Sequence, residues 1–315
     1  MCCEKEEFCG KMSSKSLRLG TLGILYFVQG APYGFQSSCL PIILRQAGLS
    51  FTQLGVMKLL FLPWVCKPLY APFVDGTMTK QFWLVLTMAL LGITCIVTGL
   101  ICSIHNIITL SAVLFLLNLF SAAQDIAVDS LAVRILQNEE ELGIGNTIQV
   151  VAYKSGSIFA GGILLYLEHY LGWSGMFNVF ASIYLICILL ITYLNLVERA
   201  MPVTNTKNTA QNDSNSMKSL DPRNRDSALS AFFKLFKVDG TIWMVCFVMF
   251  YKLCERAEQT FSMYLVDKQV PTTTLAAWST ILKTFSLGGS TYAGFRFLRK
   301  KVRYSDYNQN FVLRL

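Results

Sequence analysis

The chain has 315 residues, of which 53% are hydrophobic and only 15% are charged. Soluble domains carry about a quarter charged residues, so this deficit argues against an ordinary soluble protein and indicates a surface that largely faces lipid. The formal net charge of +8 is compatible with nucleic-acid binding. However, the basic residues lie between and after apolar runs, where they set the orientation of a membrane protein. Composition therefore predicts a membrane protein, with no nucleic acid among its partners.

Eight apolar runs are long enough for transmembrane helices, each of which needs about 20 mostly apolar residues. They cover residues 19–44, 53–74, 82–103, 107–133, 146–167, 173–196, 241–265 and 274–295. The first run lacks the small-residue pattern of a cleavage site, so we expect an uncleaved anchor. We predict an all-α, polytopic membrane protein.

One long polar segment divides the chain. Residues 197–240 are rich in Asn, Ser, Thr and Lys, the composition of a disordered linker. Six spans, a long loop and further spans are the organisation of a two-half transporter. Because two spans follow the loop where six are expected, we expect a truncated product. The predicted parts are an N-terminal tail (1–18), a six-helix bundle (19–196), the linker (197–240), the start of a second bundle (241–295) and a basic tail (296–315) that fits an aberrant end.

Lysine and arginine residues gather on one side of the predicted membrane. The segment before the first span carries Lys5, Lys11, Lys15 and Arg18, and the linker carries seven more basic residues. Cytoplasmic loops of membrane proteins carry such an excess. We therefore expect the N-terminus and the linker to lie in the cytoplasm.

The first, second and fourth spans contain polar or charged residues that are unusual inside a bilayer. Span one is interrupted at residues 29–34 (QGAPYG), where we expect a break that frees backbone groups for a solute, or a simple kink. Span two holds Lys58 and Lys67, both of which can extend toward the interface. In span four, Asp125 and Asp129 are four residues apart and share a helix face, which suits proton binding because like charges disfavour each other's ionisation. The alternative for this pair is a salt bridge to a neighbouring lysine or to Arg134.

Spans five and seven carry lysines next to tyrosines. Lys154 follows Tyr153 about 12 Å from the cytoplasmic end of its helix, near the middle of the bilayer. It suits an anionic solute or a proton-linked group, with an ion pair to Asp125 as the alternative. Span seven repeats the pair as Tyr251 and Lys252, followed by Glu255, and this charged face must line an aqueous cavity or partner helices.

Nothing in the sequence supports an enzyme. The chain has two histidines, both at predicted hinges, and no Ser/His/Asp set, zinc-ligand spacing or phosphate-binding loop. We expect no cofactor and no metal. A membrane receptor is the second hypothesis, which the dispersed charges inside the spans and the six-plus-loop layout disfavour.

Short motifs along the chain carry a resemblance to a known family. In order, they are residues 29–34 (QGAPYG), 48–50 (GLS), 67–75 (KPLYAPFVD), 124–129 (QDIAVD), 145–154 (GNTIQVVAYK) and 251–253 (YKL). Together they resemble the branch of the major facilitator superfamily that contains bacterial muropeptide permeases and the acetyl-CoA transporter of the endoplasmic reticulum. The resemblance covers roughly residues 17–283. The superfamily's loop signature between spans two and three is degenerate here, and spans nine to twelve are missing.

The resemblance implies a twelve-helix carrier that works by alternating access and moves an anionic solute such as acetyl-CoA together with protons. Its alternative is a receptor or a regulatory truncated isoform. The predicted partners are an anionic small molecule, protons and the lipid bilayer. The predicted substrate-binding residues are Gln29, Lys58, Tyr153, Lys154, Tyr251 and Lys252, and the predicted proton-coupling residues are Asp125, Asp129 and Glu255.

Overall fold

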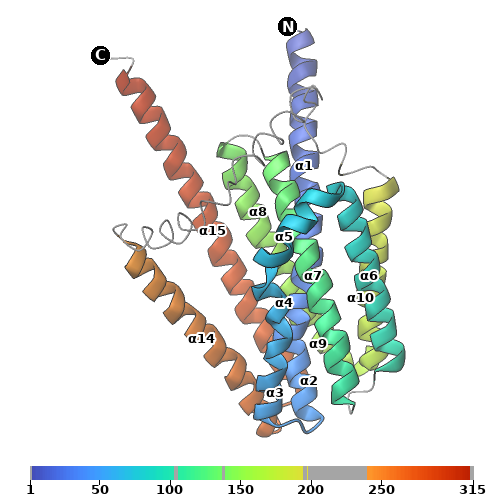
Figure 1. Cartoon of the computed structure of the whole chain (residues 1–315). Helices are drawn as coiled ribbons and strands as arrows, with labels where there is room; N and C mark the ends of the chain where they lie inside the picture. Colours follow the sequence, from blue (N-terminus) through green and yellow to red (C-terminus); the bar gives the residue numbers. More distant parts are fainter. Residues whose placement is uncertain (1, 103–105, 137–138, 194–196, 198–239, 313–315) are drawn as a thin grey trace, which may run out of the picture. The chain divides into compact units, whose positions relative to one another are not determined.

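The structure is a computed structural model that describes residues 2–102, 106–136, 139–193, 197 and 240–312 (Figure 1). The side chains of residues 2–15, 75, 139–140, 255, 293–295 and 297–312 are not described. In the part of the chain that the structure describes, every regular element is a helix. The chain forms two compact units, residues 1–201 with 263–315 and residues 202–262. The predicted linker lies outside the described residues, apart from its two ends.

The first span is one continuous helical path. It consists of α1 (Cys2–Gly34), the π-helical turn η1 (Phe35–Cys39) and α2 (Leu40–Gln46). The break predicted at residues 29–34 is wrong, because α1 runs through Pro32 to Gly34. Instead, the helix widens by one π turn after it, where the Leu40 amide bonds to the Phe35 carbonyl. Such single π turns inside helices are frequent at functional sites.

The second span is assembled from short helical pieces. In order they are α3 (Phe51–Met57), the 3-10 turn η2 (Lys58–Phe61), α4 (Leu62–Val65) and α5 (Lys67–Thr77). Ser50 opens α3 with a capping box, in which its hydroxyl accepts from the Gln53 amide at 3.2 Å and its own amide donates to the Gln53 side chain at 2.8 Å. Pro63 and Pro68 each stand near the start of a new piece, because proline lacks the amide needed inside a helix.

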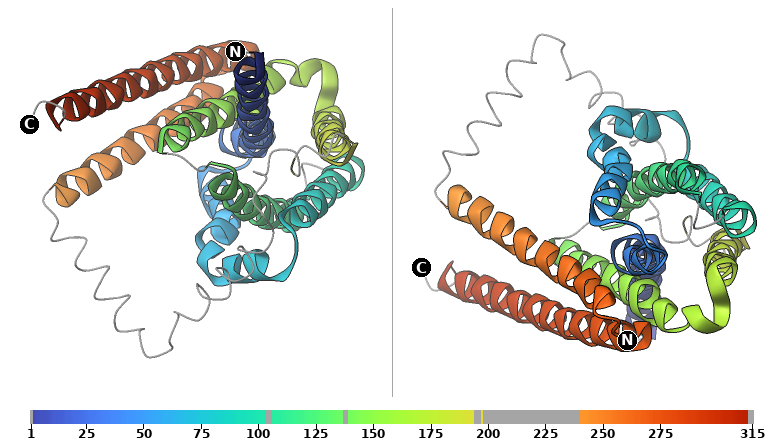
Figure 2. Two further views of the ribbon diagram at one scale, coloured as in Figure 1. Left: turned by 90° about the horizontal axis from the view of Figure 1, so that it is seen from above. Right: turned by 90° about the horizontal axis from the view of Figure 1, so that it is seen from below.

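Four further spans follow in chain order. They are α6 (Lys80–Ile101), α7 (Ile107–Ile135), α8 (Glu139–Ile158) continued by the π turn η3 (Phe159–Ile163) and α9 (Leu164–Tyr166), and α10 (Glu168–Tyr193). Thr79 caps α6 and Asn106 caps α7 through side-chain oxygens. Figure 2 shows α6 between α7 and α10, and α6 packs on both.

Two helices follow the linker, α14 (Thr241–Asp267) and α15 (Thr272–Val312). Helix α15 continues past residue 295, where the predicted eighth span ends, to Val312.

Within the described residues, five helical segments are long and apolar enough to cross a membrane. They are Phe51–Val74, Lys80–Ile101, Ile107–Ile135, Glu141–Tyr166 and Glu168–Tyr193. Many large apolar side chains on them are exposed, for example Leu69, Leu100 and Ile108 at 74–84% exposure. Such a surface suits lipid rather than water. The chain is therefore an all-α, multi-pass integral membrane protein.

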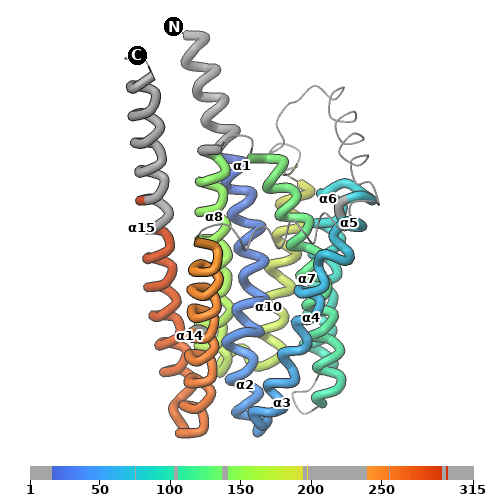
Figure 3. Tube along the Cα trace, turned by 60° about the vertical axis from the view of Figure 1, so that its left-hand side comes forward, coloured from blue at the N-terminus to red at the C-terminus, as the bar shows by residue number. Residues whose placement is uncertain are grey.

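Helices α1 and α8 pack against each other and run side by side in Figure 3. Gly30 and Gly34 lie directly against the backbone of Tyr153 and Ser157, and Gly156 lies against the Phe27 carbonyl. A methyl group at any of the three positions would overlap these backbone atoms. Small residues four apart are the usual means by which membrane helices approach this closely.

Candidate functional site

A cluster of polar side chains lies among the first, second and fourth spans, and we call it the central polar cluster. Its members are Tyr26, Gln29, Gln36, Trp64, Lys67, Asn118, Asp125 and Asp129. The first three come from α1 and η1, the next two from α4 and α5, and the last three from α7. Polar groups inside a bilayer are costly unless they meet partners, so a shared cluster is a default candidate for function.

An ion pair between Lys67 and Asp125 stands at the middle of the cluster. Only 24% of the Lys67 side chain and 14% of the Asp125 side chain are exposed. The Lys67 ammonium also lies 4.1 Å from the centre of the Trp64 ring, whose electron-rich face attracts a cation. The structure thus pairs Asp125 with a lysine of span two, which agrees with the alternative of a salt bridge to a neighbouring lysine and not with Arg134 or Lys154 as the partner.

Gln29 is fully buried beside Asp125. Its amide satisfies both of its neighbours when the nitrogen donates to Asp125 Oδ1 at 3.3 Å and the oxygen accepts from the Asp125 amide at 3.2 Å. The predicted interruption of span one therefore contributes a side chain to the cluster from an unbroken helix. Two residues of the predicted site, Gln29 and Asp125, are in direct contact.

The second carboxylate has a different setting. Asp129 is largely exposed and accepts a hydrogen bond of 2.9 Å from the Tyr26 hydroxyl. Asp125 and Asp129 lie on one face of α7, as predicted, yet only Asp125 lies in a lysine pair. The two carboxylates of α7 therefore have different partners, a lysine for Asp125 and a tyrosine hydroxyl for Asp129.

Amide and indole groups extend the cluster along α7. The Trp64 indole donates to Asn118 Oδ1 at 3.1 Å, and Asn118 donates to Gln36 Oε1 at 2.7 Å. Sequence reasoning did not single out Trp64, Asn118 or Gln36. A signal exists: Gln36 follows Gln29 by seven residues, and Asn118 precedes Asp125 by seven, so each pair shares a helix face.

Two buried groups on the same helix stand near the cluster in sequence. Gln124 is completely buried, and neither of its amide atoms meets a partner among the described residues. The same is true of the Ser121 hydroxyl. Buried polar atoms normally have a hydrogen-bond partner. The Gln124 amide and the Ser121 hydroxyl are therefore donors and acceptors whose partners are not among the described residues.

Lys154 belongs to a second group of polar contacts, between α8 and α15. Its ammonium donates to the Ser290 hydroxyl at 2.5 Å, to the Ser286 hydroxyl at 3.0 Å and to the Ser286 carbonyl at 3.3 Å. The neighbouring Tyr153 packs its ring against Tyr33 of α1, with 5.6 Å between ring centres. The predicted pair Tyr153 and Lys154 therefore joins α8 to two different helices.

The remaining predicted residues are Lys58, Tyr251, Lys252 and Glu255. Lys58 is exposed on η2. Tyr251 and Lys252 are exposed on α14, in the unit formed by residues 202–262, and their ring-to-ammonium distance is 5.7 Å. The side chain of Glu255 lies outside the described residues. For these residues the predicted roles stay predictions.

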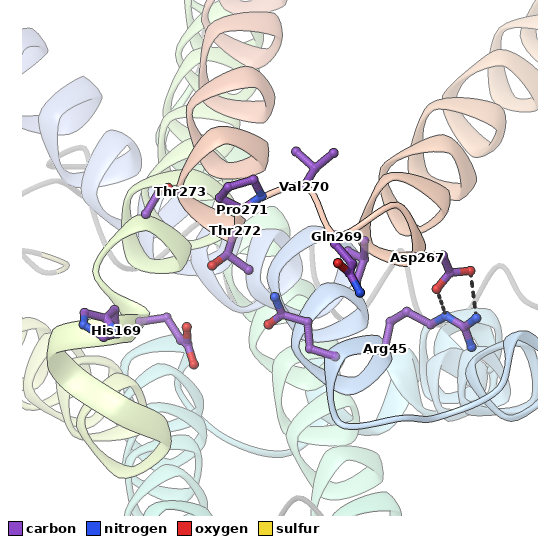
Figure 4. Close-up of a pocket in the computed structure, with 11 residues that line it drawn as sticks. Arg45, His169, Asp267, Gln269, Val270, Pro271, Thr272 and Thr273 are labelled. Atoms are coloured by element: carbon purple, nitrogen blue, oxygen red, sulfur yellow. Dashed lines mark hydrogen bonds and ion pairs between the residues drawn. The ribbon is translucent and has the colours of Figure 1, made fainter.

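A third feature is an open pocket of about 590 Å³ at the end of the spans away from the N-terminus. Figure 4 shows Arg45, at the end of α2, facing Asp267, at the end of α14. Two hydrogen bonds of 2.6 and 2.8 Å join them, and Arg45 also lies 4.2 Å from the centre of the Phe51 ring. The guanidinium holds the pKa of Asp267 below its usual value, because its hydrogen bonds favour the charged carboxylate.

Comparison with known proteins gives a consistent set of relatives. The sequence pattern of the family described as Major Facilitator Superfamily matches residues 22–305. An uncharacterized protein of Haemophilus influenzae is 31% identical over 156 residues, which is 48% of this chain and 36% of that protein. The anhydromuropeptide permease of Escherichia coli K12 is 29% identical over 190 residues, or 56% of this chain and 38% of the permease.

A putative transporter of Rickettsia conorii, AmpG 1, is 22% identical over 252 residues, which is 76% of this chain and 58% of that protein. The chain thus covers between 36% and 58% of the length of these three relatives.

Proposed function

Since the chain belongs to the Major Facilitator Superfamily, we propose that it is a solute:proton symporter that works by alternating access and carries an anionic solute, with acetyl-CoA or another anionic metabolite as the candidate. We further propose that the N-terminus and the linker lie in the cytoplasm, on the evidence of the Lys/Arg distribution. The pocket at Arg45 and Asp267 then faces the opposite side.

The observation that carries the proposal is the ion pair between Lys67 and Asp125. A proton on Asp125 removes the partner of Lys67, and the ammonium then attracts an anion. An anion on Lys67 likewise removes the partner of Asp125 and favours its protonation. The proton and the anion therefore bind together, each replacing one half of the pair.

The charge of the site supports the same mechanism. The empty site holds one positive and one negative charge. The loaded site holds the ammonium, the bound anion and a neutral carboxyl, so for a singly charged anionic group its net charge is unchanged. Moving unbalanced charge through a low-dielectric region is expensive, so a carrier whose empty and loaded states have equal charge can change conformation in both.

The other predicted residues take supporting roles in this proposal. Gln29 orients Asp125 through its amide, and Tyr26 and Asp129 form a second proton-accepting position. We assign Lys154 and Tyr153 to solute binding at α8. Tyr251 and Lys252 as solute ligands, Glu255 as a proton-coupling group and Lys58 as a solute ligand rest on the sequence alone.

A muropeptide is the second candidate solute. The Escherichia coli relative named anhydromuropeptide permease, 29% identical over 190 residues, favours it. Both candidates are anionic solutes, and the proposed Lys67 mechanism applies to either.

Uptake into proteoliposomes tests the proposal. Vesicles containing the chain are given labelled acetyl-CoA or labelled anhydromuropeptide, with and without an inward proton gradient, and empty vesicles serve as controls. We expect one of the two solutes to accumulate, and to do so faster with the gradient. Absence of accumulation for both would overturn the choice of solutes, and accumulation that ignores the gradient would overturn proton coupling.

A further inference from the structure

A row of lysine and serine side chains lies between α8 and α15, next to the end of span one. Lys154 of α8 donates to Ser286 and Ser290 of α15. In the opposite direction, Lys283 of α15 donates to the Ser38 hydroxyl of η1 at 2.6 Å. Neither Lys283 nor the three serines was singled out by the sequence. Lys154 therefore reaches from α8 to α15, and Lys283 reaches from α15 to η1.

The spacing of the residues along α15 explains why these side chains form a row. Residues 283, 286 and 290 are three and four positions apart, so they share the face of α15 that meets α8. On α8, the helix continues from Lys154 to the glycine pair Gly161 and Gly162 in η3. A methyl group at Gly161 would lie 2.6 Å from the Lys283 ammonium, so the missing side chain is what admits that ammonium.

The same geometry gives the spacing between the two charges. Lys154 and Gly161 are seven residues apart, which is about 10 Å along a helix. Because the Lys283 ammonium lies at Gly161, the two ammonium groups stand on the order of 10 Å apart along α8. Both are half-buried, and so are Ser38 and Ser290.

Hydroxyl and carbonyl oxygens are exchangeable ligands for an ammonium group. Hydrogen bonds between an ammonium and an anionic oxygen are shorter and about twice as strong as those between neutral groups. An incoming phosphate or carboxylate therefore forms stronger hydrogen bonds to these ammonium groups than the serine oxygens do. The released hydroxyls can in turn donate to the anion, because a hydroxyl is both donor and acceptor.

We propose that Lys154 and Lys283, with Ser38, Ser286 and Ser290, form a two-point anion site for a solute that carries two separate anionic groups. This assignment rests on the proposed function and names its substrate class. The shared chemistry is a pair of oxyanion groups on the order of 10 Å apart. Such a pair occurs in a phosphorylated coenzyme thioester and in a peptide with two carboxylates, and the experiment below separates the two.

The packing of these helices does not require lysines at positions 154 and 283. Close approach of η3, which continues α8, to α15 is already provided by Gly162 against Thr280 and by the buried Ala276. Placing ammonium groups at a membrane helix interface is expensive, and ionisable residues there mark solute or ion pathways by default. Two of them on one row indicate a ligand that meets both.

The test measures binding to the full chain in detergent through the rise in melting temperature with ligand concentration. The probes are acetyl-CoA, a short peptide carrying two carboxylates, and acetate as a single-charge control. The variants are Lys154→Met, Lys283→Met and Lys283→Arg, which keeps the charge. Arg296→Met is the matched control, because it removes a positive charge from an exposed position on the same helix.

We expect one two-charge probe to bind the wild-type chain far more tightly than acetate does. Either Met variant should weaken that binding roughly tenfold or more, while Lys283→Arg retains most of it and Arg296→Met leaves it unchanged. The probe that binds identifies the phosphate or the carboxylate class. Melting temperatures without ligand show whether each variant is folded.

Three outcomes would overturn the assignment. They are wild-type affinity in the Lys283→Met variant, acetate binding as tight as that of the two-charge probes, and failure of both two-charge probes to bind. The proposed function is judged separately by proteoliposome uptake. A wild-type chain that accumulates a solute while Lys283→Met changes nothing refutes the two-point site alone.

Discussion

Lys67 and Asp125 form an ion pair that is neither buried nor free in water. About a quarter of the lysine side chain and a seventh of the carboxylate side chain are exposed. A fully buried ion pair is hard to separate, and a fully exposed ion pair contributes little free energy. The intermediate setting, with Trp64 beneath the ammonium and Gln29 beside the carboxylate, lets the pair be stable at rest and still accept a proton and an anion.

Substitution of the pair one member at a time should destabilise the protein more than substitution of both. Either single substitution, Lys67→Met or Asp125→Asn, leaves an unpaired charge in a site that is partly shielded from water. We expect each to lower the free energy of unfolding by about 2 kcal/mol. The double variant removes the mismatch and should recover most of that loss. Thermal unfolding of the full chain in detergent measures this.

Arg134→Met serves as the control, because it removes an exposed charge from α7. It should change stability by less than about 0.5 kcal/mol. If the stability losses of the two single variants simply add in the double variant, Lys67 and Asp125 do not interact energetically. The assignment of the two residues as an ion pair would then be wrong.

Sequence reasoning found the charges of the cluster but not their pairing. Asp125 and Asp129 stand out because carboxylates are rare in an apolar run. The partner, Lys67, lies 58 residues away on another helix, and a single sequence contains no measure of that proximity. Trp64 and Asn118 were overlooked because an indole or an amide in a span is as often a packing residue.

At the scale of elements, α1 and α8 pack through glycine faces on both helices. Gly30 and Gly34 on α1 and Gly156 on α8 each lie against backbone of the other helix. This contact fixes the distance between Gln29, on α1, and Lys154, on α8. Because Gln29 belongs to the central polar cluster and Lys154 to the proposed anion site, the glycine contact holds the two sites at a constant separation.

Enlarging a glycine in this contact should therefore destabilise the protein. For Gly156→Ala the added methyl group meets the Phe27 carbonyl, and overpacking of this kind typically costs about 1–3 kcal/mol. The measurement is the midpoint of thermal unfolding, with transport as a second readout.

Gly20→Ala is the matched substitution for that experiment. Gly20 lies on α1 with nothing within 4 Å of an added methyl group, so alanine should be neutral or stabilising by up to about 1 kcal/mol. Equal effects of the two substitutions would mean that the close contact between α1 and α8 does not contribute to stability.

The positions of most helices were predictable and the irregular turns were not. Runs of about 20 apolar residues predict spans directly, because an apolar helix of that length has few other stable environments. The break expected at residues 29–34 did not form, since packing of Gly30 and Gly34 against α8 supports the helix there. The π turn at Phe35–Cys39 depends on that packing, so local sequence does not reveal it.

At the scale of the whole molecule, Arg45 and Asp267 connect the end of span one to the end of span seven. A carrier that works by alternating access must separate its two halves at one end of the membrane in each cycle. If those halves are the predicted bundles, this pair has to open whenever the solute site faces its side. Arg45 is half-buried and Asp267 is exposed, so we expect the pair to contribute little to overall stability and to act chiefly on the rate of opening.

The pKa of Asp267 determines how this pair responds to pH. Its pKa is lowered from the ordinary value of 3.8, because Arg45 stabilises the carboxylate. Because the pKa of Asp267 is lowered, the stabilisation by the ion pair is fully present at pH values above the ordinary pKa. It is lost only as the pH falls through the lowered pKa of the folded protein. Between about pH 5 and 8 the pair should therefore stay ionised, and the pH dependence of transport must come from elsewhere, in our proposal from Asp125.

Charge reversal tests this separation of roles. Arg45→Asp or Asp267→Arg places like charges face to face, which should open the contact and change the initial rate of uptake by roughly two- to fivefold at every pH from 5 to 8. The doubly reversed protein, Arg45→Asp with Asp267→Arg, restores opposite charges and should return toward the wild-type rate. Asp125→Asn should instead flatten the pH profile, because it removes the proposed proton-binding group. A flattened profile in the Asp267→Arg variant, or no recovery in the double variant, would show that the contact between Arg45 and Asp267 is not an independent gate.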